Sequence, residues 1–182
     1  MTKRLMIGLA AVAASVLPAQ SAFAASATVT GNVNAGTLSI TTTATPSFSV
    51  TLDGTDKTGS YSVPTTVTDA TGSGAGWNLT ITSTQFTTGG GSPSTLPTNA
   101  SSITGVTSSC VTTCVDPTNS ITYPVGVPAG STPPTAVKYF NASATTGTGK
   151  FTNTPAVDVA VPASSAVGSY SSTLTLAAVS GP

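Results

Sequence analysis

The chain has 182 residues, of which only 5% are charged, and it contains no His. The few Lys and Arg residues do not form the basic clusters that nucleic-acid-binding proteins use to meet phosphates, and there is no basic amphipathic helix to bind a membrane surface. A hydrophobic fraction of 38% with so little charge also differs from disordered chains, which combine low hydrophobicity with high net charge.

Residues 1–24 have the three parts of a secretory signal peptide. A basic start is followed by an apolar run and by an Ala-Phe-Ala cleavage site. The apolar run is shorter than the roughly 20 residues that a membrane-spanning helix needs, which argues against a membrane anchor. We expect cleavage after Ala24, with Ala27 as a second candidate. Residues 25–182 would then form a single secreted domain that does not insert into the membrane.

Apolar and polar residues alternate with period two through the rest of the chain, and no stretch has helical periodicity. Each alternating run places its apolar side chains on one face of an extended strand. Turn-forming Gly, Pro and Asp residues separate the runs, and the longest loops are expected at residues 87–102 and 128–136. The predicted strands lie around residues 29–33, 38–40, 48–52, 61–63, 67, 77–82, 103–106, 121–127, 137–139, 157–161 and 170–176.

The number and spacing of these strands indicate the fold class. Roughly nine to eleven short strands separated by turns are typical of a β-sandwich or a barrel. The lack of helices excludes the helical crossovers that connect the strands of a parallel sheet. We therefore predict an all-β fold, an antiparallel β-sandwich of the immunoglobulin-like kind rather than a closed barrel.

Cys110 and Cys114 are the two cysteines of the chain. Export to an oxidising compartment favours a disulfide between them. The three intervening residues differ from the usual redox-active spacing, and a cysteine-based metal site would lack further ligands. We predict a structural disulfide that stiffens a loop, with a small effect on global stability because the closed loop is short.

Groups able to catalyse reactions are scarce. General acid–base catalysis relies most on His and Glu, and the chain has neither, so a Ser–His–Asp triad is excluded. Asp53 and Asp56 are the only two carboxylates close together in the sequence, and the further ligands of a calcium loop do not follow them. We interpret them as a solvated turn. The prediction is a non-catalytic protein with no cofactor and no metal.

Trp77 is the only tryptophan, and it alternates with polar residues ahead of Leu79. Its indole could stack on a sugar ring, or it could fill the core together with Leu79. The period-two geometry favours the core. Tyr170 and Leu174 form a similar pattern near the end of the chain.

Two blocks of the sequence resemble the WxL-domain surface proteins. Gly-Trp-Asn-Leu at residues 76–79 looks like the first Trp-x-Leu motif of that family, and residues 161–163 and 168–182 look like its C-terminal block. Where many members have a second Trp-x-Leu motif, this chain has Leu-Ala-Ala at residues 176–178. The resemblance covers residues 25–182. It makes four residues candidates for wall binding or for the family motif: Trp77, Leu79, Tyr170 and Leu174.

The resemblance implies a β-sandwich displayed on a Gram-positive-type cell wall and held non-covalently to peptidoglycan or another wall polymer. It also implies complexes with other surface proteins, some of them in adhesion. The sequence has no sortase-type Leu-Pro-x-Thr-Gly motif, in keeping with non-covalent attachment. The alternative is a structural subunit of a pilus- or coat-like assembly, because Thr-rich, weakly charged edge strands pair readily with other strands.

Overall fold

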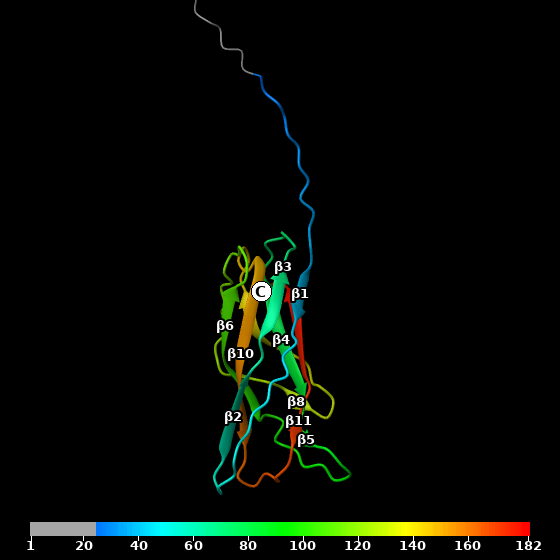
Figure 1. Cartoon of the computed structure of the whole chain (residues 1–182), viewed down its shortest axis with the longest axis vertical. Helices are drawn as coiled ribbons and strands as arrows, with labels where there is room; N and C mark the ends of the chain where they lie inside the picture. The colour runs from blue at the N-terminus through cyan, green and yellow to red at the C-terminus, as the bar shows by residue number, and fades with distance from the viewer. Residues whose placement is uncertain (1–24) are drawn as a thin grey trace, which may run out of the picture. The chain divides into compact units, whose positions relative to one another are not determined.

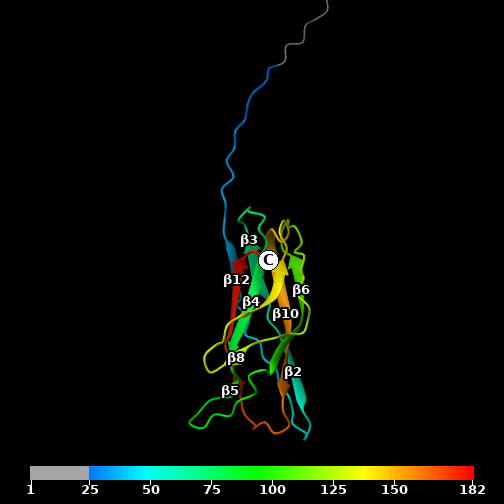
Figure 2. The same ribbon diagram turned by 180° about the vertical axis from the view of Figure 1, so that it is seen from behind.

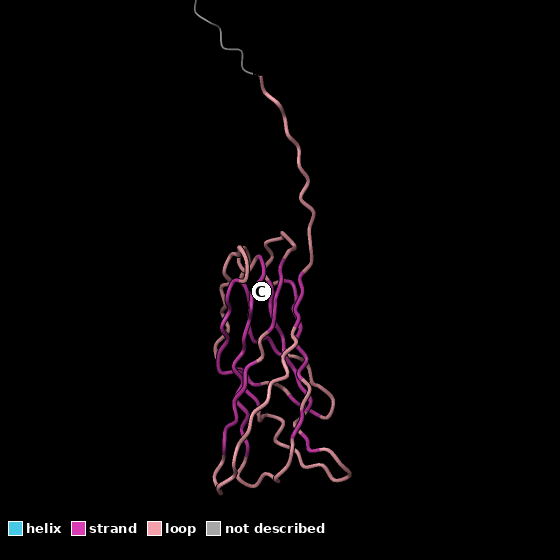
Figure 3. The backbone as a smooth tube through the Cα atoms, viewed as in Figure 1, coloured by secondary structure: helices cyan, strands magenta, loops and turns pink. Residues whose placement is uncertain are grey.

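The computed structural model describes residues 25–182, and this part of the chain contains strands and loops without a helix (Figure 3). The predicted all-β class is confirmed. The predicted signal peptide, residues 1–24, lies outside the described residues. No helix able to cross a membrane occurs between residues 25 and 182. The chain divides into an N-terminal unit that ends at Val33 and a folded unit from Asn34 to Pro182.

Twelve strands occur in the described residues, all within the folded unit (Figure 1). They are β1 (Leu38–Thr41), β2 (Lys57–Ser62), β3 (Thr65–Asp69), β4 (Trp77–Thr84), β5 (Thr87–Thr88), β6 (Ser101–Cys110), β7 (Val125–Gly126), β8 (Ala129–Gly130), β9 (Val137–Ala142), β10 (Gly149–Val161), β11 (Tyr170–Ser171) and β12 (Leu174–Ser180).

The strands form three sheets. The largest has the order β1-β3-β10-β6-β7, with β2 also paired to β10. The second has the order β12-β4-β8, with β9 also paired to β4, and β5 and β11 form a small third sheet. Every pairing is antiparallel except the two-residue pairing of β4 with β8. The sheets are therefore almost wholly antiparallel, as predicted from the lack of helical crossovers.

The two larger sheets lie against each other (Figures 1 and 2), and they share one apolar core. Val67 of β3 and Phe151 of β10 contribute to it from the first sheet, and Trp77, Leu79 and Ile81 of β4 contribute from the second. All five side chains are fully buried. Because alternate residues of a strand point to opposite faces, the period-two pattern of the sequence places these residues in the core.

Strand β10 is the central strand of the largest sheet, and it contains a proline. Along one edge it pairs with β6. Along the other edge its first part pairs with β3 and its last part pairs with β2. Pro155 has no N–H to donate, but it lies opposite the break between β2 and β3, where Val63 N donates to the Pro155 carbonyl oxygen at 3.2 Å. The break in the neighbouring strand explains how a central strand accommodates a proline.

Two of the predicted strands are wrong. Residues 29–33 form no strand, and Val29 and Val33 are 92% and 101% exposed. Residues 48–52 do turn alternate side chains toward the protein interior, where they pack against a second apolar cluster around Leu96. Their backbone, however, joins no strand. The predicted strand at residues 121–127 is shortened to β7.

Candidate functional site

Trp77 occupies the centre of the core and exposes none of its surface. Its ring lies 5.8 Å from that of Phe140 and 6.4 Å from that of Phe151, measured between centroids. Its Nε1 donates a hydrogen bond to the Gly147 carbonyl oxygen at 2.8 Å. The indole therefore has no free face on which a sugar ring could stack, and it attaches the turn before β10 to the core.

Gly147 shows how closely the chain is fitted around this tryptophan. Its φ of +74° is one that residues with a side chain rarely adopt, and a Cβ placed there would lie 2.7 Å from Trp77 Nε1. Glycine at this position is therefore required by both the backbone conformation and the approach of the indole.

The two sequence blocks that resemble the WxL family are neighbours in space. Strand β12 pairs with β4 along its whole length, so that Ala178 lies opposite Leu79 and Ser180 lies opposite Trp77. Leu79 is fully buried, whereas Leu174 is half-buried and packs against the edge of the same core. Three of the four candidate residues thus belong to one core region.

Tyr170 lies apart from the other three candidates. Its ring packs against the second apolar cluster, which contains Leu96. Its hydroxyl donates to the Ala166 carbonyl oxygen at 2.9 Å, which holds the loop that precedes β11. The structure therefore separates Tyr170 from Trp77 and Leu79.

Tyr170 lines a surface groove of about 600 Å³. One wall is formed by the loop around residues 93–97 and the other by residues 162–170. The lining consists of hydroxyl, amide, prolyl, aliphatic and aromatic groups and contains no charged side chain. We refer to it as the Tyr170 groove, and it is lined by Gln85, Pro93, Ser94, Thr95, Leu96, Pro97, Pro162, Ser164, Ser165, Ala166 and Tyr170.

Hydrogen bonds hold both walls of the Tyr170 groove in place. In the first wall, Gln85 Nε2 donates to the Leu96 carbonyl oxygen at 2.6 Å, and Leu96 N donates to the Phe86 carbonyl oxygen at 3.0 Å. In the second wall, Ala163 N donates to Asp56 Oδ1 at 2.8 Å. These contacts connect both walls of the groove to the rest of the folded unit.

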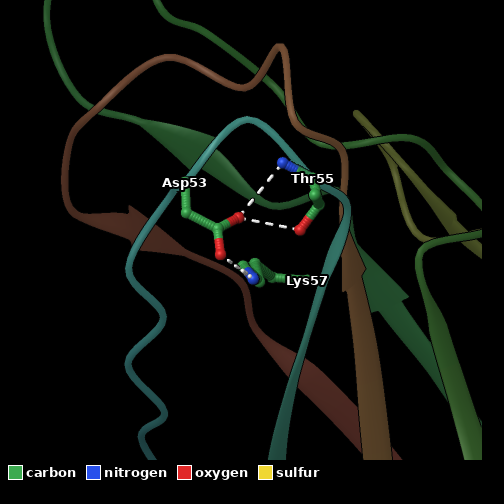
Figure 4. Close-up of polar contacts among 3 residues, drawn as sticks. All are labelled: Asp53, Thr55 and Lys57. Atoms are coloured by element: carbon green, nitrogen blue, oxygen red, sulfur yellow. Dashed lines mark hydrogen bonds and ion pairs between the residues drawn. The ribbon is translucent and has the colours of Figure 1, made fainter.

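Within the described part of the chain, the one ion pair lies in the turn that contains Asp53 (Figure 4). Lys57 Nζ lies 2.6 Å from Asp53 Oδ2, and Asp53 Oδ1 accepts hydrogen bonds from the backbone N–H and the hydroxyl of Thr55. The hydrogen bond from Lys57, followed by those from Thr55, lowers the pKa of the Asp53 carboxyl. The carboxylate is thus satisfied within its own turn.

The structure contains the predicted disulfide. Cys110 ends β6 and is bonded to Cys114. The small loop that they close and the residue that follows it are tied to β10 and its preceding turn, because Val111 N donates to the Lys150 carbonyl oxygen and Val115 N to that of Thr148. In the described part of the chain, no three His, Cys, Asp or Glu residues are grouped so that they could hold a metal ion.

Sequence reasoning identified Tyr170 but missed the groove around it. Gln85 and Ser165 are far apart in the sequence, and neither has a motif that marks it as functional. The only indication was the prediction of a long loop at residues 87–102, which supplies one wall. The other wall follows from the packing of the 162–170 loop.

Comparison with known proteins identifies one family. The sequence profile described as "WxL domain surface cell wall-binding" matches residues 24–181. No curated protein and no solved structure matches the chain. The family consists of binding domains that are generally non-catalytic and that attach to the cell wall without a covalent bond. The chain therefore belongs to the WxL domain surface cell wall-binding family and is a cell-surface protein that binds the wall non-covalently.

Proposed function

We propose that the chain is a non-catalytic module that binds peptidoglycan, or another polymer of the wall, in the Tyr170 groove. The observation that carries this proposal is the lining of the groove, which combines hydroxyl and amide groups with Tyr170 and has no charged side chain. Binding sites commonly combine apolar surface with a few polar groups that fix the orientation of the ligand.

The chemistry of the groove suits a polymer rich in hydroxyl and amide groups. Ser94, Ser164 and Ser165 offer hydroxyls that both donate and accept hydrogen bonds. The Tyr170 ring and the prolines of both walls offer apolar surface on which the face of a sugar ring can rest. Because the groove has no charge, binding would depend little on ionic strength.

The same proposal includes the finer description of the fold. Residues 25–182 would form one domain, an immunoglobulin-like β-sandwich. Support comes from the core that the two larger sheets share and from the nearly complete antiparallel pairing. Support for a non-catalytic role comes from the composition, which lacks His and Glu.

The proposal is tested by sedimenting insoluble peptidoglycan with the mature chain. Ala166→Glu places a bulky charged side chain in the groove, and we expect it to weaken the binding affinity at least about tenfold, equivalent to about 1.4 kcal/mol. Ala75→Glu is the matched control, since Ala75 is exposed in the loop before β4 and does not line the groove. Its binding should equal that of the parent chain.

Two outcomes would contradict the proposal. If the parent chain stays in the supernatant with both intact walls and stripped peptidoglycan, the chain binds no wall polymer and the proposal is wrong. If Ala166→Glu binds as well as Ala75→Glu, the wall is bound somewhere other than in the Tyr170 groove. Binding to intact walls but not to stripped peptidoglycan would identify an accessory wall polymer as the ligand.

A further inference from the structure

Strands β1 and β12 leave a partly open seam between the two larger sheets. Each is an edge strand of its sheet, and the two lie side by side in both views (Figures 1 and 2). Their inward side chains are only half-buried, whereas Leu79 and Ile81 of the adjacent β4 are fully buried. The half-buried side chains are Leu38, Ile40, Leu174 and Leu176.

The backbone of β12 has an unpaired edge at this seam. Thr84 N donates to the Thr173 carbonyl oxygen at 2.9 Å, and Gly181 N donates to that of Gly76 at 3.0 Å, so residues 173 and 181 direct their backbone groups toward β4. These directions alternate along an antiparallel strand, and within residues 25–182 no strand pairs with the other side of β12. The residues of β12 whose N–H and C=O groups point away from β4 are Leu174, Leu176, Ala178 and Ser180.

This edge lacks the features that usually prevent strand pairing. Natural edge strands are commonly guarded by charged residues or by proline. Neither β1 nor β12 contains any of these, whereas β9, on the opposite side of β4, carries Lys138. The seam is therefore chemically suited to accept a further strand.

Residues 27–33 have the properties of a strand without a partner. Their sequence, Ala-Thr-Val-Thr-Gly-Asn-Val, alternates apolar or small residues with polar ones and has no charge. Val29 and Val33 are almost wholly exposed, and the segment forms no strand. It has seven residues, as does β12, so that it could pair with β12 along its full length.

We infer that residues 27–33 of one copy add as a strand to the free edge of β12 in a second copy. In antiparallel pairing along the full length, Val33 lies opposite the half-buried Leu174 and Val29 lies opposite Ala178, while the backbone pairs with the outward groups of β12. Each copy carries one donor segment and one acceptor edge, so the contact is head-to-tail and generates open chains. This inference is independent of the Tyr170 groove, and either can fail without the other.

The test is the oligomeric state of the mature chain, measured by analytical ultracentrifugation. We expect oligomers that grow between about 1 and about 500 µM by mass action. V29K/V33K disables the donor, and Ala178→Pro removes an outward N–H from the acceptor, so each variant should be monomeric. An equimolar mixture of the two should form heterodimers, since the first retains an intact acceptor and the second an intact donor.

A second measurement does not depend on the fold of the proline variant. A synthetic peptide of residues 25–34, added to V29K/V33K, should slow hydrogen exchange at the amides of Leu174, Leu176 and Ala178. A scrambled peptide is the control and should leave these amides unchanged. The inference is overturned if the parent chain remains monomeric throughout, if its oligomers persist in both variants, or if the peptide protects none of the three amides.

Discussion

At the scale of single residues, two buried asparagines differ in whether their amides are satisfied. Asn141 accepts hydrogen bonds from Ser120 N at 2.8 Å and from the Ser120 hydroxyl at 3.1 Å. Asn153 is fully buried, and neither Oδ1 nor Nδ2 has a hydrogen-bond partner in the described protein. An unpaired buried polar group costs about 1–3 kcal/mol. Asn153 therefore lowers the free energy of unfolding, while Asn141 raises it.

We predict opposite effects for the same substitution at these two sites. Asn153→Leu should raise the free energy of unfolding by about 1–3 kcal/mol, because the unpaired amide is removed at nearly constant volume. Asn141→Leu should lower it by a similar amount, because Ser120 loses its acceptor. Urea unfolding followed by circular dichroism measures both changes. A loss of stability in Asn153→Leu equal to that in Asn141→Leu would contradict this account.

The candidate site residues were predictable only in part, and Trp77 shows why. The alternation of Trp77 with polar neighbours correctly favoured a core position, because period two reports which face of a strand a residue occupies. The hydrogen bond from Trp77 Nε1 to Gly147 could not be predicted in this way. It joins residues 70 positions apart, and no local pattern encodes the pairing.

At the scale of elements, residues 48–52 show the limit of the same pattern. Phe48, Val50 and Leu52 alternate as in a strand and turn toward the second apolar cluster, yet their backbone joins no sheet. Alternation requires an extended chain with one buried side, and it does not require a backbone partner. The Phe48 ring instead packs on Gly59, where a Cβ would lie 2.1 Å from a ring carbon. The sequence therefore predicts extension here but not pairing.

The disulfide loop is an element whose contribution can be measured separately. Replacing both cysteines, C110S/C114S, should lower the free energy of unfolding by no more than about 2 kcal/mol, because so short a loop restricts the unfolded chain only modestly. The backbone bonds from Val111 and Val115 to the 148–150 segment remain. Hydrogen exchange should accelerate in residues 111–115 and stay unchanged in β4. Global unfolding of the variant at room temperature would refute this prediction.

At the scale of the whole molecule, the fold class was predictable and the Tyr170 groove was not. An all-β chain follows from many short alternating runs with turns between them. The groove depends on two loops that meet only after the sheets have packed, and they are held by the contacts of Gln85 with Leu96 and of Ala163 with Asp56. Ser and Thr occur throughout this chain, so their presence in a groove cannot be distinguished in sequence from their presence on an exposed strand.

The composition of the whole molecule also determines how its stability responds to pH. The chain has no His, the side chain whose ordinary pKa lies near neutrality, and its cysteines form a disulfide. We therefore predict a nearly constant melting temperature between about pH 5 and 9. The ion pair of Asp53 contributes little at acid pH because it lies at the surface.

Buried tyrosines determine how the stability of the fold changes at alkaline pH. Burial raises the pKa of Tyr61 to about 12 and also raises the pKa values of Tyr123 and Tyr139, whereas tyrosines of the unfolded chain ionise near pH 10. Because the folded pKa is the higher one, the stabilisation is complete below about pH 10 and is lost as the pH rises through about 12. Calorimetry from pH 5 to 12 should show this fall, and Tyr61→Phe should make it shallower. A step in stability near pH 7 would contradict this reasoning, since the chain has no His.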